Sequence, residues 1–130
     1  MQITKNNIDE FIDRTRIRLG SRKITKIDYV PEGITHLHLG NNELTELPKL
    51  PESLTHLYCY NNNITSLPKL PDSLIRLNCQ NNKLTKLPKL PEGLNISCQN
   101  NNLPYKVTIN NVREHNKLLK RKEILKLICT

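Results

Sequence analysis

The stretch that decides the fold is a run of three blocks: ITHLHLGNNELTELPKLPES at residues 34–53, LTHLYCYNNNITSLPKLPDS at 54–73 and LIRLNCQNNKLTKLPKLPEG at 74–93. The blocks align without gaps at 20 residues each, in the pattern L-x-x-L-x-L/C-x-N-N-x-L-T-x-L-P-K-L-P. Self-similarity at a short fixed period is the signature of a stacked repeat. Because one block cannot bury its own leucines, neighbouring blocks must stack and fold together.

The repeat continues more weakly on both sides of these blocks. A further coil begins at Leu94 and has lost one residue, because Cys98 follows Cys79 by 19 positions. Before the blocks, the apolar positions recur 20 residues earlier, although Arg22 stands where the other coils have asparagine. The sequence therefore predicts about five coils over residues 17–104.

Each coil is expected to supply one short strand. Alternate residues of a strand point to the same side, so Leu57 and Cys59 point inward while His56 and Tyr58 point outward. Equivalent strands then stack side by side and in parallel. The predicted strands lie near residues 36–39, 56–59, 76–79 and 95–98.

Asparagine and proline define the rest of each coil. Asn42, Asn62, Asn82 and Asn101 recur just after the strand, where a buried amide can satisfy backbone groups left unpaired by a sharp turn. The two prolines of each L-P-K-L-P segment lock φ and remove two backbone donors, which excludes a helix. We therefore expect an asparagine ladder, an extended, polyproline-like convex side and a parallel β-sheet on the concave side.

The pattern L-T-x-L-P-K-L-P-x-S-L-x-x-L-x-C-x-N-N resembles the short bacterial-type leucine-rich repeats of type III secreted effectors, of ubiquitin-ligase effectors and of large DNA viruses. The resemblance covers roughly residues 17–104, with Cys59, Cys79 and Cys98 at the usual position of valine. It implies a leucine-rich-repeat solenoid with a protein-binding concave face. The ligase effectors have a separate catalytic domain after their repeats, and this chain has no length left for one.

The chain reads as a single domain over residues 1–130, with a cap at each end. Asn7 followed by Glu10 resembles a helix N-cap, and it predicts a helical cap within residues 1–16. After the coils, the alternation over 105–110 places Val107 and Ile109 inward, as in one last strand.

A basic capping helix is expected over roughly residues 112–128, opened by Asn111 with Glu114. Two sets of apolar side chains fall on opposite sides of it. One set is Val112, Leu118, Leu119, Leu125 and Cys129, and the other is Ile124, Leu127 and Ile128. The apolar final turn indicates either a second buried contact, such as a homodimer, or a helix that stops before residue 124.

The charge is concentrated at the two ends. The net charge of +8 divides into +3 for residues 1–23, 0 for 24–104 and +5 for 105–130. In each L-P-K-L-P-E/D segment the lysine is followed at a constant distance by an acidic residue, so the positive and negative charges on the convex side cancel. An acidic partner or a phosphate backbone would therefore find the excess lysines and arginines of this protein at the two ends of the chain.

The outward strand positions are the candidate protein-binding residues. Arginine, tyrosine and histidine combine a large contact area with a polar group, as interface hot spots do. The partner-binding residues predicted on the concave face are Arg16, Arg18, His36, His38, His56, Tyr58, Tyr60, Arg76, Asn78 and Gln80. The alternative is that these residues only fill the outward positions of strands.

Neither the cysteines nor the histidines are assigned to a metal. Three of the cysteines recur at the same inward position, so they are interpreted as part of the core. His36 and His56 are expected about 5 Å apart, and His38 about 7 Å along the strand, but without a carboxylate or a fourth ligand beside them. We therefore predict no metal site and no cofactor.

The sequence favours a protein-interaction module that binds a partner protein through the concave face, and the resemblance to effector repeats implies a host-directed effector. No catalytic constellation is visible, so no enzyme is predicted. The alternative function is binding of nucleic acid or an anionic surface through Arg113, Lys117, Lys120, Arg121, Lys122 and Lys126. The first twenty residues lack the apolar core of a signal peptide, and no membrane span is evident, which indicates the cytoplasm of the producing or host cell.

Overall fold

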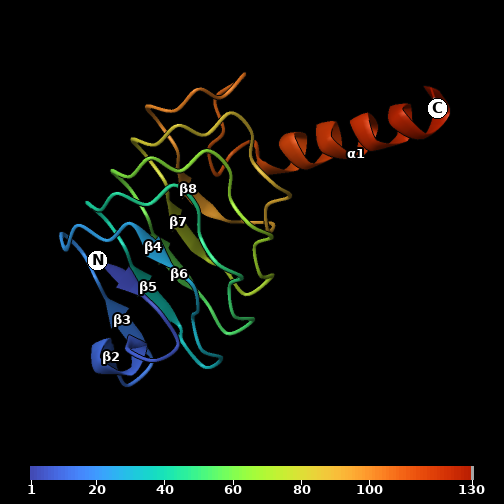
Figure 1. The fold of residues 1–130 in the computed structure, drawn as a ribbon. Coiled ribbons are helices and arrows are strands. Elements are labelled where there is room, and N and C mark those ends of the chain that lie inside the picture. The colour runs from blue at the N-terminus through green and yellow to red at the C-terminus, as the bar shows by residue number, and fades with distance from the viewer. Residues whose placement is uncertain (130) are drawn as a thin grey trace.

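The computed structural model describes residues 1–129 and shows a stack of about five coils followed by one long helix (Figure 1). The elements are β1 (Gln2–Ile3), η1 (Ile8–Phe11), β2 (Ile12–Asp13), β3 (Arg16–Arg18), β4 (Lys26–Ile27), β5 (His36–His38), β6 (His56–Tyr58), β7 (Arg76–Asn78), β8 (Asn95–Ser97) and α1 (Val112–Cys129). The η1 element is a single 3-10 turn. The predicted solenoid is confirmed.

Six of the strands form one sheet in the order β2-β3-β5-β6-β7-β8. The strands from β3 to β8 are parallel and in register, so that Leu37 pairs with Leu57 and Leu57 pairs with Leu77. The four strands predicted from the repeat are each present, one residue shorter than expected. The shorter β2 joins the edge of β3 in the antiparallel sense.

The core runs along the inside of the stack and is built from the repeated apolar positions. Leu37, Leu57 and Leu77 from the strands are fully buried, and so are Cys59 and Cys79 two residues further on. Pro48 and its equivalents lie in segments with neither helix nor strand, as expected from residues that cannot donate a backbone hydrogen bond.

The predicted asparagine ladder is present. The Oδ1 atom of Asn62 accepts a hydrogen bond from the backbone N–H of Leu44 at 3.0 Å. Its Nδ2 donates to the carbonyl oxygens of Leu39 at 3.0 Å and Cys59 at 3.1 Å, so one amide joins two coils. Asn42, Asn82 and Asn101 repeat this arrangement.

Replacing Asn62 with leucine should destabilise the fold by about 1–3 kcal/mol, because the backbone groups that the amide satisfies would remain buried without partners. Chemical denaturation of the variant would measure the loss. The neighbouring Asn63 is exposed, so Asn63→Leu is the matched control and should change the unfolding free energy little. Equal losses for the two variants would show that the ladder contributes nothing.

A second, exposed asparagine ladder was not predicted. Asn41, Asn61, Asn81 and Asn100 have positive φ angles of 53° to 59°, a conformation that asparagine tolerates better than most residues. Their side chains form a chain in which each Nδ2 donates to the Oδ1 of the preceding coil at 2.7 Å. The first asparagine of each N-N pair therefore adopts the positive φ angle of the turn. The side chain of the second makes hydrogen bonds to the backbone groups around the turn.

The predicted N-terminal helical cap is not confirmed. Residues 8–11 form only a single 3-10 turn, and the side chain of Asn7 makes no capping hydrogen bond to it. Instead the Asn7 amide binds backward, accepting from the N–H of Thr4 and donating to the carbonyl of Gln2. Ile8 is nevertheless buried, and β1 pairs in parallel with β4 to form a two-stranded sheet at this end.

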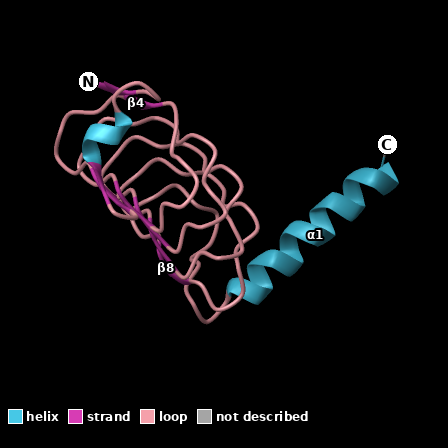
Figure 2. Ribbon diagram, turned by 90° about the horizontal axis from the view of Figure 1, so that it is seen from below, coloured by secondary structure: helices cyan, strands magenta, loops and turns pink. Residues whose placement is uncertain are grey.

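The C-terminal helix predicted over roughly residues 112–128 is confirmed, but the last strand predicted before it is not present. Residues 105–110 contain no strand, and Ile109 is exposed, although Val107 is buried as expected. The helix α1 does not stop before residue 124 but continues to Cys129. It contacts the last coils through its first turns and then projects away from the stack, so it is not a lid lying over the core (Figure 2). The side chain of Cys129 lies outside the described residues.

Candidate protein-binding surface

The predicted binding residues come together on the outward side of the six-stranded sheet. We call this surface the sheet face and define it by two rows of residues in register. The first row is Arg16, His36, His56, Arg76 and Asn95, and the second is Arg18, His38, Tyr58, Asn78 and Ser97. Each row crosses five strands, because side chains at equivalent positions of parallel strands lie side by side.

Aromatic rings stack along both rows. The rings of His36 and His56 lie 4.3 Å apart with an angle of 7° between their planes, and His38 stacks on Tyr58 at 4.6 Å. His56 and Tyr58, on one strand, have ring centres 6.3 Å apart. The four rings therefore form one continuous aromatic patch in the middle of the sheet face, close to the spacing expected from strand geometry.

Threonine hydroxyl groups hold the two histidines of the first row. The Oγ1 of Thr35 lies 2.9 Å from Nδ1 of His36, and the Oγ1 of Thr55 lies 2.9 Å from Nδ1 of His56. The Thr55 hydroxyl also donates to the carbonyl oxygen of Thr35 at 3.0 Å. Sequence reasoning missed these anchors, although the recurrence of threonine immediately before His36 and His56 is visible in the repeat.

A third row extends the patch beyond the strand ends. The ring of Tyr60 lies over the backbone of Gly40, and a Cβ atom placed on Gly40 would overlap that ring. Gln80 follows at the equivalent position and is hydrogen-bonded to Gln99. The absence of a side chain at Gly40 therefore leaves the space that the ring of Tyr60 occupies. This contact between neighbouring coils was not predicted from the sequence.

The sheet face has a positive charge. Arg16, Arg18 and Arg76 are exposed on it, while Asp13 of β2 pairs in register with Arg16 and brings one carboxylate to its edge. Burial lowers the pKa of His36 and of His38 below the ordinary value of 6.5, and the neighbouring positive charges lower both further. The two histidines therefore resist protonation in the folded protein.

Acidification should destabilise the protein through these two histidines. A pKa that is lower in the folded than in the unfolded chain gives stability that is fully present above about pH 6.5 and is lost as the pH falls through the folded value. The melting temperature of the wild type should therefore drop more between about pH 7.5 and pH 5 than that of His36→Gln/His38→Gln. Parallel melting curves for the two proteins would contradict this expectation.

The cysteines of the repeat lie in the core, as predicted. Burial raises the pKa of Cys59 to about 12 and also raises that of Cys79, so neither thiol is a nucleophile at neutral pH. Cys98 donates its S–H to the carbonyl oxygen of Val107 at 3.1 Å. Within residues 1–129, no three His, Cys, Asp or Glu side chains come together in a way that could hold a metal ion.

The cations of the alternative site lie on α1. Lys117, Lys120, Lys122 and Lys126 face a groove between the helix and the coils, whereas Arg121 does not line it. Arg113 forms an ion pair with Glu92 at 3.6 Å.

No helix in the described part of the chain has the length and the apolar character needed to cross a bilayer.

Coils with one parallel strand each, a leucine core and an asparagine ladder form a solenoid whose architecture is consistent with leucine-rich repeats. A family model described as Leucine Rich repeats (2 copies) matches residues 52–92, a stretch that includes β6 and β7. This match supports a leucine-rich-repeat protein. A comparison with curated proteins found no match.

Proposed function

We propose that the chain is a protein-interaction module that binds a partner protein through its sheet face. The observation that carries the proposal is the patch of four stacked rings, from His36, His38, His56 and Tyr58, with arginines at its ends. Solenoids of this kind commonly present such an extended surface to other proteins.

The chemistry of the patch suits an interface centre. Rings held by stacking and by threonine hydroxyls lose little conformational freedom on binding, so more of their contact energy contributes to affinity. Asn78 and Gln80 offer amide groups beside the rings, where a polar rim is expected. This arrangement supports direct recognition of a protein surface and involves no catalytic step.

The charge of the sheet face favours an acidic partner surface. Arg16 and Arg18 are exposed beside the ring patch, and Arg76 is exposed on its far side. Arginine forms bidentate hydrogen bonds with carboxylates, which adds direction to the attraction. The resemblance to effector repeats extends the proposal to a host-cell protein as the partner and to the cytoplasm of the producing or host cell as the place where they meet.

Capture experiments at increasing salt test this function against nucleic-acid binding. Immobilised wild-type protein should retain at least one protein from a nuclease-treated lysate in about 300 mM salt, because apolar and aromatic contacts are weakly screened. The variant Lys120→Glu/Arg121→Glu/Lys122→Glu should retain that protein as well, because the protein binds the sheet face and not the groove beside α1. Loss of all captured protein with this variant, together with a steep salt dependence, would instead favour the basic helix as the binding element.

A further inference from the structure

The helix α1 is fixed to the solenoid only near its beginning. Val112 is buried, and His115 is buried with its Nε2 at 2.9 Å from the carbonyl oxygen of Pro88 and its Nδ1 at 2.7 Å from the Tyr105 hydroxyl. The Asn116 amide donates to the carbonyl of Leu90 and accepts from its N–H, at 2.7 and 2.9 Å. These contacts set the angle at which α1 leaves the coils (Figure 1).

A groove of about 1040 Å³ lies between the projecting helix and the outer wall of the coils. Its apolar lining is the half-buried Pro88 from the wall and Leu119 from α1, with the largely buried Leu67 and Leu87 behind them. A helix about 10 Å across occupies roughly 400 Å³ per turn, so the volume of the groove equals that of about two to three helical turns. It is separate from the sheet face.

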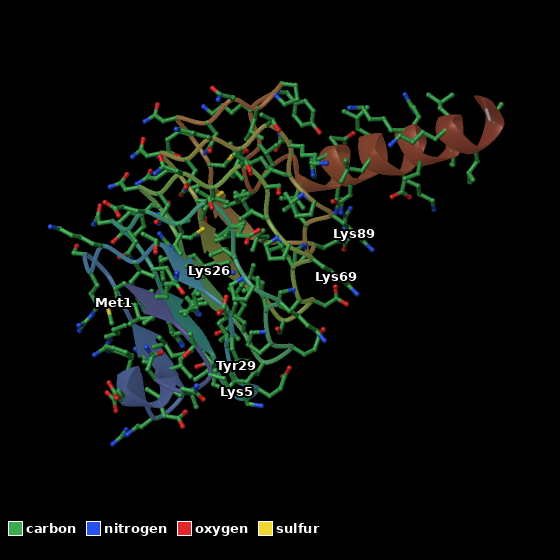
Figure 3. The ribbon with its side chains drawn as sticks, in the orientation of Figure 1. Met1, Lys5, Lys26, Tyr29, Lys69 and Lys89 are labelled. Atoms are coloured by element: carbon green, nitrogen blue, oxygen red, sulfur yellow. The ribbon has the colours of Figure 1, made fainter. Side chains whose placement is uncertain are left out.

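Lysines line both sides of this groove. Lys86 and Lys89 extend from the wall, and Lys117, Lys120 and Lys122 extend from α1. The lining carboxylates are Glu92 and Glu123, of which Glu92 is already paired with Arg113. Figure 3 shows Lys69 and Lys89 on the edge of the stack nearest α1. The groove is therefore strongly cationic.

The distal half of α1 has a composition that favours association with a partner. Ile124, Leu125 and Ile128 are 48%, 52% and 73% exposed. Lys117 and Arg121 are four positions apart in α1, a spacing at which like charges destabilise a helix. Because a helix with few tertiary contacts is marginally stable in water, carboxylates of a partner beside Lys117 and Lys120 would stabilise this part of α1.

We propose that the groove binds an acidic amphipathic helix of a partner protein. Carboxylates along one face of that helix would pair with the lysines of both walls, and its apolar face would cover Pro88 and Leu119. A second copy of this chain carries the same positive charge in this region and is disfavoured. A nucleic-acid backbone has no apolar face for the groove, and a flat bilayer cannot enter between its walls.

Binding of a designed peptide tests the proposal. The probe is a fluorescein-labelled peptide of about 20 residues that places leucine on one helical face and glutamate on the other. A scrambled peptide of the same composition, without an apolar stripe, is the comparison. Fluorescence anisotropy with the full chain should show binding of the amphipathic peptide at least about tenfold tighter than that of the scrambled peptide.

Two matched pairs of variants locate the binding site. Lys117→Glu should weaken binding at least about tenfold, whereas Arg121→Glu, the same charge reversal outside the groove lining, should change it less than about twofold. Lys89→Glu should likewise weaken binding, and Lys49→Glu, at the equivalent position two coils away, should not. Circular dichroism would confirm that the variants keep their helix.

Three results would overturn the proposal. Equal losses within each pair, or equal affinity for the scrambled peptide, would mean that only general electrostatic attraction operates. Duplex DNA or anionic vesicles that bind more tightly than the peptide, with the same dependence on Lys117 and Lys89, would assign the groove to a different ligand. Sedimentation showing a dimer that dissociates in Ile128→Glu would assign this region to a second copy of the chain.

The proposal is independent of the function of the sheet face. Tyr58→Ala/Tyr60→Ala leaves the groove intact, so this variant should bind the amphipathic peptide as the wild type does. Peptide binding that fails in the wild type overturns the groove proposal alone, and it leaves the capture experiment on the sheet face unaffected.

Discussion

Leu57→Ala is expected to lower the free energy of unfolding by about 2–5 kcal/mol. Leu57 is fully buried in β6, in the middle of the sheet, and pairs with the equivalent leucines of β5 and β7. Alanine would leave a cavity where three coils meet. Since each coil depends on its neighbours, the loss should appear in one cooperative transition when unfolding is followed by denaturant titration.

The adjacent outward residue provides the control. Tyr58 is partly exposed and stacks on His38, so Tyr58→Ala should cost about 1 kcal/mol, the contribution of one aromatic pair. A cost for Tyr58→Ala as large as that for Leu57→Ala would mean that the strand register is shifted by one residue. Such a shift would turn every side chain of the strand to the other side.

Tyr58→Ala combined with Tyr60→Ala is expected to weaken binding of the partner by about 10²- to 10³-fold without unfolding the protein. Hot-spot aromatic residues contribute about 2 kcal/mol each, and 1.4 kcal/mol corresponds to a tenfold change in affinity. The two rings lie on the same side of the sheet and contact His38 and Gly40, respectively. Their removal would flatten the centre of the sheet face while leaving the core filled.

The coils could be predicted from the sequence because each position recurs with the same partners. Once the blocks are aligned, Leu37, Leu57 and Leu77 must share one environment, and the alternation around them separates the core from the sheet face. The same reasoning correctly placed the cysteines and the buried asparagines. It also placed the ten candidate binding residues on one side of the sheet, and their role in binding remains a prediction.

The two ends were predicted less completely than the coils, because they occur only once. The C-terminal helix is present as α1, Val112–Cys129, but the strand before it and the N-terminal helix are not. Asn7 and Asn111 both resemble helix N-caps, but in both cases the side-chain oxygen accepts from the backbone three residues earlier, at Thr4 and Thr108. Their amide nitrogens donate five residues back, to Gln2 and Lys106. Each asparagine therefore closes the loop before it, which a local pattern cannot distinguish from a cap.

The direction in which α1 leaves the coils could not be predicted from the sequence either. Its apolar residues are consistent with a helix lying on the core, but only the first turns are used in this way, through Val112 and the buried His115. The hydrogen bonds of His115 and Asn116 to the backbone near Pro88 and Leu90 fix the exit angle. These hydrogen bonds join residues that are 26 positions apart in the sequence, and no local pattern shows that the fold brings them together.

The most direct test of the central claim, that the sheet face binds a protein, is calorimetric titration of the captured partner into the wild type and into Tyr58→Ala/Tyr60→Ala, with denaturation curves for both. We expect the double variant to unfold cooperatively, with a free energy of unfolding that differs from the wild type by about 1–2 kcal/mol, and to bind at least about 10²-fold more weakly. A folded double variant that binds the partner with wild-type affinity would contradict the claim.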